Sequence, residues 1–130
     1  MRMRKPTVQV YAGARVLIVE DNPDRLVWFS HRLTGCDVLH TKDPDRAIEL
    51  LELYGYVGYH CIFLDHDLGG DFQPPYTTDV AKAIRDHTGM IFQKNIVIHS
   101  LNPAGAANLQ TILPPAIRLS FGSFEIEVLP

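Results

Sequence analysis

Acidic, imidazole and hydroxyl side chains gather in three short segments of the chain. Glu20-Asp21 follows one apolar run, Asp65-His66-Asp67 follows a second, and His99-Ser100-Leu101-Asn102 follows a third. Carboxylate oxygens are the ligands that Mg²⁺ and Mn²⁺ prefer. Imidazole groups bind softer metals or transfer protons near neutral pH. If the three segments meet in space, the sequence predicts a divalent-cation site with two histidines beside it.

The elements that would position these segments are strands and helices in alternation. Runs rich in β-branched residues predict buried strands at residues 14–19, 36–40, 59–64, 95–98 and 117–121. Helices are expected between them, opened by cap residues or prolines near residues 23, 44, 78 and 103. This alternation predicts a three-layer, doubly wound α/β domain. Its mostly parallel, five-stranded sheet is expected to have the flavodoxin-like strand order 2-1-3-4-5.

The two ends of the chain are expected to depart from this pattern. Residues 1–12 predict an N-terminal arm or an added strand, ahead of a single domain over residues 13–130. Residues 124–128 alternate like an edge strand, so the last helix is expected to be missing or replaced by a C-terminal strand. Such a strand could also pair between two chains, which leaves a homodimer open.

The expected strand order brings the three polar segments together. The first, third and fourth strands are neighbours in it, and folds of this kind bind ligands at the carboxyl ends of their strands. We therefore expect four metal ligands to converge at one edge of the sheet: Glu20, Asp21, Asp65 and Asp67. Carboxylates this close repel one another unless a proton or a cation lies between them.

The connection after the third strand is unusual. Residues 65–77 are too polar and too rich in glycine and proline for a regular element. A loop of this length in a compact domain is usually functional or mobile. Its part from Gly69 to Thr77 could close over a bound substrate.

Most of these residues also have a simpler structural role. Glu20 and Asp21 could solvate a strand end or cap the next helix, and Asp67 could shape the turn that follows it. Ser100 and Asn102 are typical turn and N-cap residues. The helix that follows them nevertheless directs backbone N–H groups at the same edge, which suits a phosphate. The sequence leaves both roles open.

Composition narrows the class of partner. The chain has 12 basic and 15 acidic residues and a net charge of −3, which argues against binding to duplex DNA. A small phosphate-bearing ligand is compatible with this charge, since a local site can oppose it. No run approaches the ~18 apolar residues of a membrane helix. Two cysteines cannot build a secreted disulfide framework, so a cytoplasmic protein is expected.

Three segments resemble strands of response-regulator receiver domains: residues 16–21, 62–65 and 96–100. The resemblance implies that the pair Glu20-Asp21 holds Mg²⁺. It also implies that Asp65 stands where receivers accept a phosphoryl group and that Ser100 takes the receiver's Ser/Thr position. The chain departs from receivers because no lysine follows its fifth strand and because it carries two histidines that receivers do not need.

A narrower combination joins Asp65-His66-Asp67-Leu68-Gly69-Gly70 with His99-Ser100-Leu101-Asn102 and Gly105. It resembles a receiver-derived family of bacteria and their phages, described as cyclic-phosphate-processing receiver-like domains. This resemblance implies a receiver site converted to phosphoester chemistry by added histidines.

Two functions follow from these observations. The first is a hydrolase, a metal-dependent phosphoesterase that processes a cyclic phosphate on a nucleotide or an RNA end. Its catalytic residues would be Asp65, His66 and His99, its phosphate ligands Ser100 and Asn102, and its cofactor Mg²⁺ or Mn²⁺. The alternative is a degenerate receiver, a signalling module that accepts phosphate at Asp65 or binds a nucleotide without catalysis.

Overall fold

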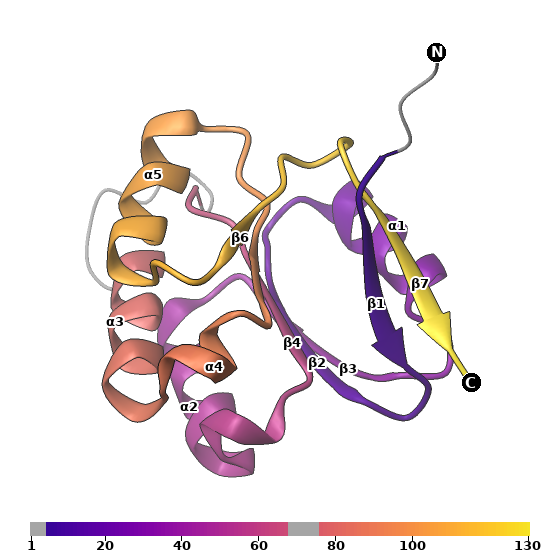
Figure 1. Ribbon diagram of the computed structural model, residues 1–130, viewed down its shortest axis with the longest axis horizontal. Helices are drawn as coiled ribbons and strands as arrows, with labels where there is room; N and C mark the ends of the chain where they lie inside the picture. The colour runs from indigo at the N-terminus through magenta and orange to yellow at the C-terminus, as the bar shows by residue number, and fades with distance from the viewer. Residues whose placement is uncertain (1–4, 68–75) are drawn as a thin grey trace.

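The computed structural model describes residues 5–67 and 76–130, and it has three layers (Figure 1). The middle layer is a parallel sheet with the strand order β3-β2-β4-β5-β6, which confirms the expected order 2-1-3-4-5. Its strands are β2 (Arg15–Val19), β3 (Asp37–Thr41), β4 (Cys61–Leu64), β5 (Ile96–Ile98) and β6 (Ile117–Arg118). The carboxyl ends of β2, β4 and β5 therefore lie side by side. Most of the loop expected to close over a substrate, residues 68–75, lies outside the described residues.

Helices cover both faces of the sheet. Their bounds are α1 (Pro23–Arg32), α2 (Pro44–Tyr54), α3 (Thr77–His87), α4 (Met90–Gln93) and α5 (Pro103–Ile112), with a 3₁₀ turn, η1 (Tyr56–Gly58). Helices α2, α3 and α5 pack on one face and α1 on the other. Proline occupies the first turn of α1, α2 and α5, as the sequence predicts, while the short α4 and η1 were not expected. Within the described ranges, no helix combines the length and apolar character needed to cross a membrane.

The strands of the sheet are buried on both faces. Successive residues of a strand point to opposite sides, so Leu17 and Val19 pack against α2 and α3 while Val16 and Ile18 pack against α1. This explains why β2, β4 and β5 read as continuous apolar runs rather than alternating ones.

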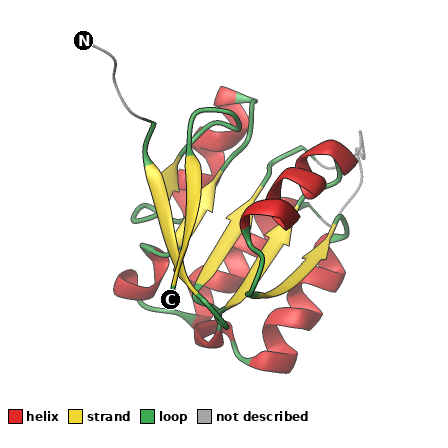
Figure 2. Cartoon of the chain, turned by 90° about the vertical axis from the view of Figure 1, so that its right-hand side faces the viewer, coloured by secondary structure: helices red, strands yellow, loops and turns green. Residues whose placement is uncertain are grey.

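A separate two-stranded ribbon completes the layer that contains α1 (Figure 2). Its strands, β1 (Thr7–Tyr11) and β7 (Glu125–Leu129), pair in parallel and bring the two ends of the chain together. The segment expected as an arm or added strand thus contains β1. The C-terminal segment forms a strand, but it pairs with β1 and not with the main sheet.

The fifth strand is shorter than expected, with two residues where 117–121 were predicted. The reason is a turn from Ser120 to Ser123, in which Gly122 adopts a φ of 91° and Ser123 N donates to Ser120 O. Only glycine adopts such a φ readily. The turn carries the chain away from the sheet edge and over the face that α1 covers.

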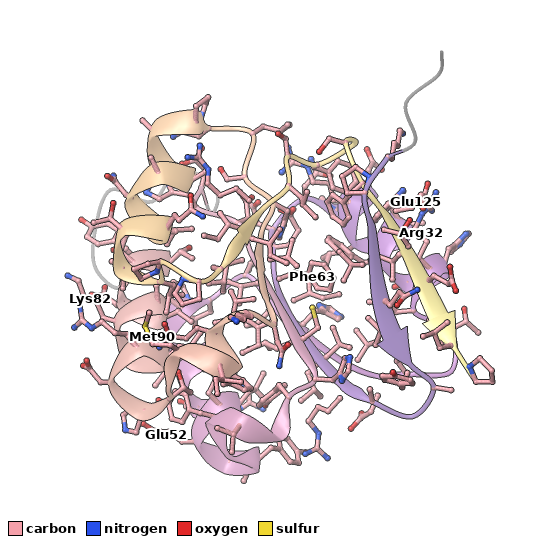
Figure 3. All side chains as sticks on the ribbon, viewed as in Figure 1. Arg32, Glu52, Phe63, Lys82, Met90 and Glu125 are labelled. Carbon is pink, nitrogen blue, oxygen red and sulfur yellow. The ribbon has the colours of Figure 1, made fainter. Side chains whose placement is uncertain are left out.

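Aromatic side chains join the ribbon to the sheet. Phe124 is buried against Trp28 and stacks on Phe63 of β4, with ring centroids 6.2 Å apart. Figure 3 shows Phe63 between the sheet and the ribbon, and Arg32 of α1 beside Glu125 of β7. These two residues form an ion pair at 2.8 Å.

We expect Phe124→Ala to lower the free energy of unfolding by about 3–5 kcal/mol, because it removes a fully buried ring and leaves a cavity. Leu53→Ala, at a side chain 67% exposed on α2, is the matched control and should change stability by less than about 0.5 kcal/mol. Urea unfolding measures both. If both variants changed the free energy of unfolding by the same small amount, the segment that carries Phe124 would not be part of the core.

Candidate functional site

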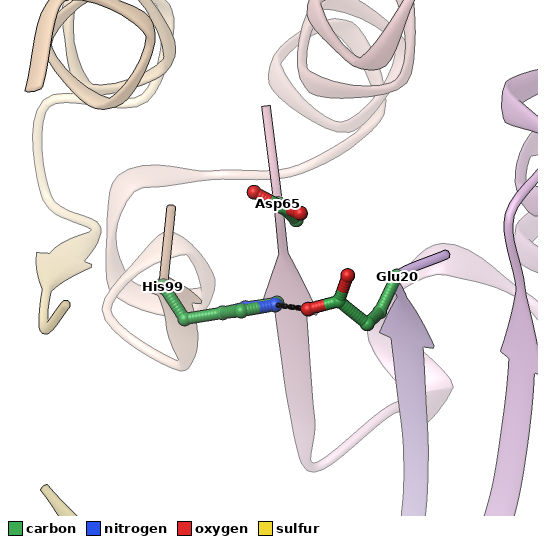
Figure 4. A group of neighbouring side chains, drawn as sticks. All are labelled: Glu20, Asp65 and His99. Atoms are coloured by element: carbon green, nitrogen blue, oxygen red, sulfur yellow. Dashed lines mark hydrogen bonds and ion pairs between the residues drawn. The ribbon is translucent and has the colours of Figure 1, made fainter. Parts of the chain in front are cut away.

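Three polar side chains meet at the carboxyl edge of the sheet (Figure 4). Glu20 follows β2, Asp65 follows β4 and His99 follows β5, and their potential metal-ligating atoms lie within 4.8 Å of one another. Their exposed fractions are 0%, 3% and 0%. The close group of ligating atoms does not include Asp21 or Asp67 among the described residues. Strand order therefore brings together one residue from each predicted polar segment.

The carboxylate of Glu20 is buried but fully hydrogen-bonded. Its Oε1 accepts from His99 Nε2 at 3.0 Å, and its Oε2 accepts from the backbone N–H groups of Asp21 at 2.9 Å and Asn22 at 3.1 Å. Burial alone would raise the pKa of Glu20, but the hydrogen bonds from His99 and Asn22 outweigh it and lower that pKa to about 2. Glu20 is thus a fixed negative charge at neutral pH.

Asp65 responds to this charge. Burial and the neighbouring Glu20 carboxylate raise the pKa of Asp65 to about 7, against the partial opposition of Arg25 and of a hydrogen bond with Ser100. Two buried carboxylates this close cannot both ionise freely. Asp65 therefore holds a proton for much of the time at neutral pH, and a cation could replace that proton.

Arg25 is part of this site, and sequence reasoning missed it. Its guanidinium lies 3.4 Å from both Glu20 Oε1 and Asp65 Oδ2, and 5.3 Å from the ring centroid of Phe121. The side chain is 19% exposed, so it reaches solvent as well as the carboxylates. One signal was available: a basic residue in the first turn of a helix opposes the helix dipole, which is unusual without a local partner.

His99 is enclosed. Its ring lies edge-on to Phe29 and Phe63, with centroids 5.3 and 6.3 Å away. Burial lowers the pKa of His99 despite the opposing effect of Glu20, which keeps the ring neutral with its Nε2–H donated to Glu20. Its Nδ1 is buried without a hydrogen-bond partner in residues 5–67 and 76–130. The position of His99 is suited to holding Glu20.

His66 has a different environment. Its Nδ1 lies 2.8 Å from Asp67 Oδ1, and that oxygen also accepts from Asn102 Nδ2 at 3.4 Å. The His66 side chain is 26% exposed. Asp67 therefore orients the ring, and Nε2 is the atom that can exchange a proton with a substrate.

Ser100 and Asn102 link the site to α5. Asn102 is the N-cap, with Oδ1 accepting from Gly105 N at 3.1 Å, and Ser100 Oγ accepts from Asn102 N at 3.1 Å. The His66 ring packs directly against Gly105, where a β-carbon would overlap the ring. A glycine in the first turn of α5 is thus required for the approach of His66.

The residues present fit a divalent cation. Asp65 offers a carboxylate whose raised pKa a bound cation would lower, and Glu20 supplies a second negative charge. Since four donors already occupy the oxygens of Glu20, its charge matters more to a cation than its lone pairs. The guanidinium of Arg25 lies against the same two carboxylates, so a bound cation would share their negative charge with it.

The comparisons with known proteins agree with this architecture. Residues 15–114 match the family model described as the cyclic-phosphate processing receiver domain. The chain belongs to this family. Since the match spans most of the chain, it includes β2, β4, β5 and all the site residues above. A comparison with curated protein sequences found no significant match.

Solved structures of similar fold include receiver domains. A response-regulator receiver protein from Sinorhizobium medicae is 23% identical with a TM-score of 0.64, over 85% of this chain and 83% of its own. The receiver domain of a sensor histidine kinase from Pseudomonas aeruginosa, which has a magnesium ion in its active-site cleft, is 21% identical with a TM-score of 0.66, over 85% and 87%. Because the two identities are only 23% and 21%, these two similarities show only that the chain shares the receiver fold.

The fit between His66 and Gly105 can be tested by a double-mutant cycle. In a helix, Gly→Ala alone should stabilise by about 1 kcal/mol. We expect Gly105→Ala to destabilise the protein while His66 is present and to destabilise it less in the His66→Ala background, where the ring is gone but the β-carbon of residue 66 remains close. Thermal unfolding of the four proteins measures the coupling. Additive effects would show that His66 does not pack on α5.

The raised pKa of Asp65 predicts a pH-dependent stability. The folded state binds this proton more tightly than the unfolded state, so the stabilisation is complete below pH 3.8 and is lost as the pH rises to about 7. Asp65→Asn should therefore match the wild type near pH 4 and exceed its unfolding free energy by about 2–4 kcal/mol at pH 8. Asp86→Asn, on the surface of α3, is the control. If the unfolding free energies of Asp65→Asn and of the wild type changed with pH in the same way, the raised pKa of Asp65 would be contradicted.

Proposed function

We propose that this receiver domain hydrolyses a cyclic phosphate ester on a nucleotide or an RNA end, with Mg²⁺ or Mn²⁺ as cofactor. One observation carries the proposal: Glu20, Asp65 and His99 lie buried together with their potential ligating atoms within 4.8 Å of one another. Burial and the neighbouring Glu20 carboxylate accordingly raise the pKa of Asp65 to about 7. A carboxyl group in this state binds either a proton or a cation, and both are useful where a phosphoester is cleaved. The family's description as cyclic-phosphate processing supports the same substrate class.

The divalent cation would be held by Asp65 and Glu20, with Asp21 as a further ligand. When bound, it would polarise the phosphoryl oxygens and favour ionisation of a water molecule. Arg25 would contribute to the same task, since its guanidinium stands beside both carboxylates and is partly exposed. A guanidinium suits the planar, bidentate recognition of phosphate oxygens.

His66 would move the protons. It would accept a proton from the attacking water at Nε2 and return it to the ring oxygen that leaves phosphorus. The net reaction adds one water to a cyclic diester and yields a phosphomonoester and a free hydroxyl. Asp67 would fix the ring orientation through its contact with Nδ1.

His99 would act through Glu20 and not on the substrate. The sequence suggests a direct catalytic role for it, but its ring is buried and its Nε2 is bound to Glu20. We therefore propose a positioning role for His99, in which its hydrogen bond keeps Glu20 ionised. Ser100 and Asn102 would bind phosphate oxygens at the start of α5, next to the backbone N–H groups there.

A cytoplasmic location also stays part of the proposal, in accord with two free cysteines, Cys36 and Cys61.

A phospho-accepting module is the second candidate. Asp65 ends β4 in a fold shared with receiver domains, and one similar structure contains the yeast receiver domain of Ssk1 with its phosphotransfer protein Ypd1 (20% identity, TM-score 0.57, over 88% of this chain and 82% of that chain). A module of this kind would be modified at Asp65 by acetyl phosphate or would bind beryllofluoride there. The hydrolase would not form a stable adduct.

Turnover of a small substrate panel tests the hydrolase. The panel holds 2′,3′-cyclic nucleotides, 3′,5′-cyclic nucleotides and an RNA with a cyclic phosphate end, each with Mg²⁺ or Mn²⁺. We expect one class to be opened, and His66→Ala to reduce kcat by about 10²–10⁴-fold. His31→Ala, which removes an exposed histidine of α1, is the matched control and should leave kcat unchanged.

The contradicting result is a folded wild-type protein that opens no member of the panel with either metal. Stable labelling of Asp65 in the same preparation would then favour the phospho-accepting module. Activity that survives in His66→Ala would remove His66 from the mechanism and leave the proposed substrate class intact.

A further inference from the structure

A pocket of about 280 Å³ lies beside the candidate site, between β5, β6 and the start of α5. Its polar lining consists of Ser100, Arg118 and Ser120, and apolar side chains of β5 and α5 complete its walls. A second cavity of similar volume opens at the other end of the strands, around Cys61 and Asn95, far along the sheet from the site. Only the first adjoins residues of the site.

Arg118 gives this pocket a positive charge. The guanidinium of Arg118 donates one long hydrogen bond, from Nη2 to Pro103 O at 3.4 Å. Among the described arginines it alone lacks a carboxylate partner, since ion pairs involve all the others: Arg15, Arg25, Arg32, Arg46 and Arg85. An arginine that faces a pocket with its charge unpaired is suited to an anionic ligand.

Ser100 connects the pocket to the chemistry. It lines the pocket, and its side chain is close enough to the Asp65 carboxyl group to lower the pKa of that group. A molecule in the pocket therefore lies next to the carboxyl group at which the cyclic phosphate is proposed to react. Since β4, β5 and β6 are consecutive neighbours, the backbone of Arg118 is two strand spacings, about 10 Å, from the strand that carries Asp65. The side chain of an arginine spans much of that distance.

We propose that this pocket binds a second phosphate group of the substrate and that Arg118 is its ligand. The inference rests on the proposed function and narrows its substrate. In a 3′,5′-cyclic mononucleotide, the 3′ and 5′ oxygens of the ribose are both bonded to the same phosphate. Such a molecule therefore has no second phosphate group. A nucleotide with a 2′,3′-cyclic phosphate and a phosphate on its 5′ side has one, as at the 3′ end of an RNA chain. The structure thus favours an RNA end over a cyclic mononucleotide messenger.

Equilibrium binding tests this inference without requiring turnover. The probes are adenosine 3′,5′-bisphosphate and adenosine 3′-monophosphate, measured by titration calorimetry in Mg²⁺. We expect the wild type to bind the bisphosphate at least about tenfold more tightly, the effect of a charge-assisted contact with arginine. Arg118→Gln should abolish this difference and leave the affinity for the monophosphate unchanged. Arg85→Gln, the same change on the surface of α3, should preserve it.

Three results would overturn the pocket assignment: equal affinity of the wild type for both probes, an equal loss of both in Arg118→Gln, or no binding of either. Failure of the proposed function looks different. It would be the absence of turnover across the substrate panel while the bisphosphate preference and its dependence on Arg118 persist, and the pocket would then belong to a nucleotide-binding module.

Discussion

The carboxylate of Glu20, buried at the end of β2, is the constraint on which the site depends. Two backbone N–H groups and the His99 ring fix it in its ionised form, with Arg25 at 3.4 Å. Burial, together with this negative charge, raises the pKa of Asp65 on the neighbouring strand to about 7. The site is therefore built around a charge that burial alone would disfavour, and the local hydrogen bonds outweigh that penalty. A proton, a guanidinium or a divalent cation can each compensate it.

The rest of the fold serves this arrangement. Parallel strand order places the ends of β2, β4 and β5 together, and the β1–β7 ribbon packs on the same face of the sheet as α1. In the aromatic core beneath the ribbon, Phe29 and Phe63 lie edge-on to the His99 ring, which is fully buried. On the other side, α5, which Asn102 caps, approaches so closely that only glycine fits at position 105 opposite His66. The sheet thus positions Glu20, Asp65 and His99, while the layers on its two faces enclose His99 and contact His66.

Much of this could be predicted from the sequence, because strand periodicity is local and the carboxyl ends of adjacent parallel strands must coincide. That reasoning located Glu20, Asp65 and His99 at one edge. It could not show that His99 is enclosed, because the enclosing rings come from distant parts of the chain. It missed Arg25 for the same reason, since two of the groups beside its guanidinium, Asp65 and the Phe121 ring, lie far along the chain. The pairing of β1 with β7 joins the two ends of the chain, which local patterns do not record.

A direct titration of the Asp65 carboxyl carbon by NMR tests the central claim, with the signal assigned by its loss in Asp65→Asn. The account predicts a midpoint at a pH of about 7 in the absence of divalent cations. Saturating Mg²⁺ should move that midpoint down by more than about one unit, because the cation replaces the proton. A midpoint near the ordinary value of 3.8, unchanged by Mg²⁺, would contradict the account, since Glu20 would then neither hold a proton on Asp65 nor help to hold a cation.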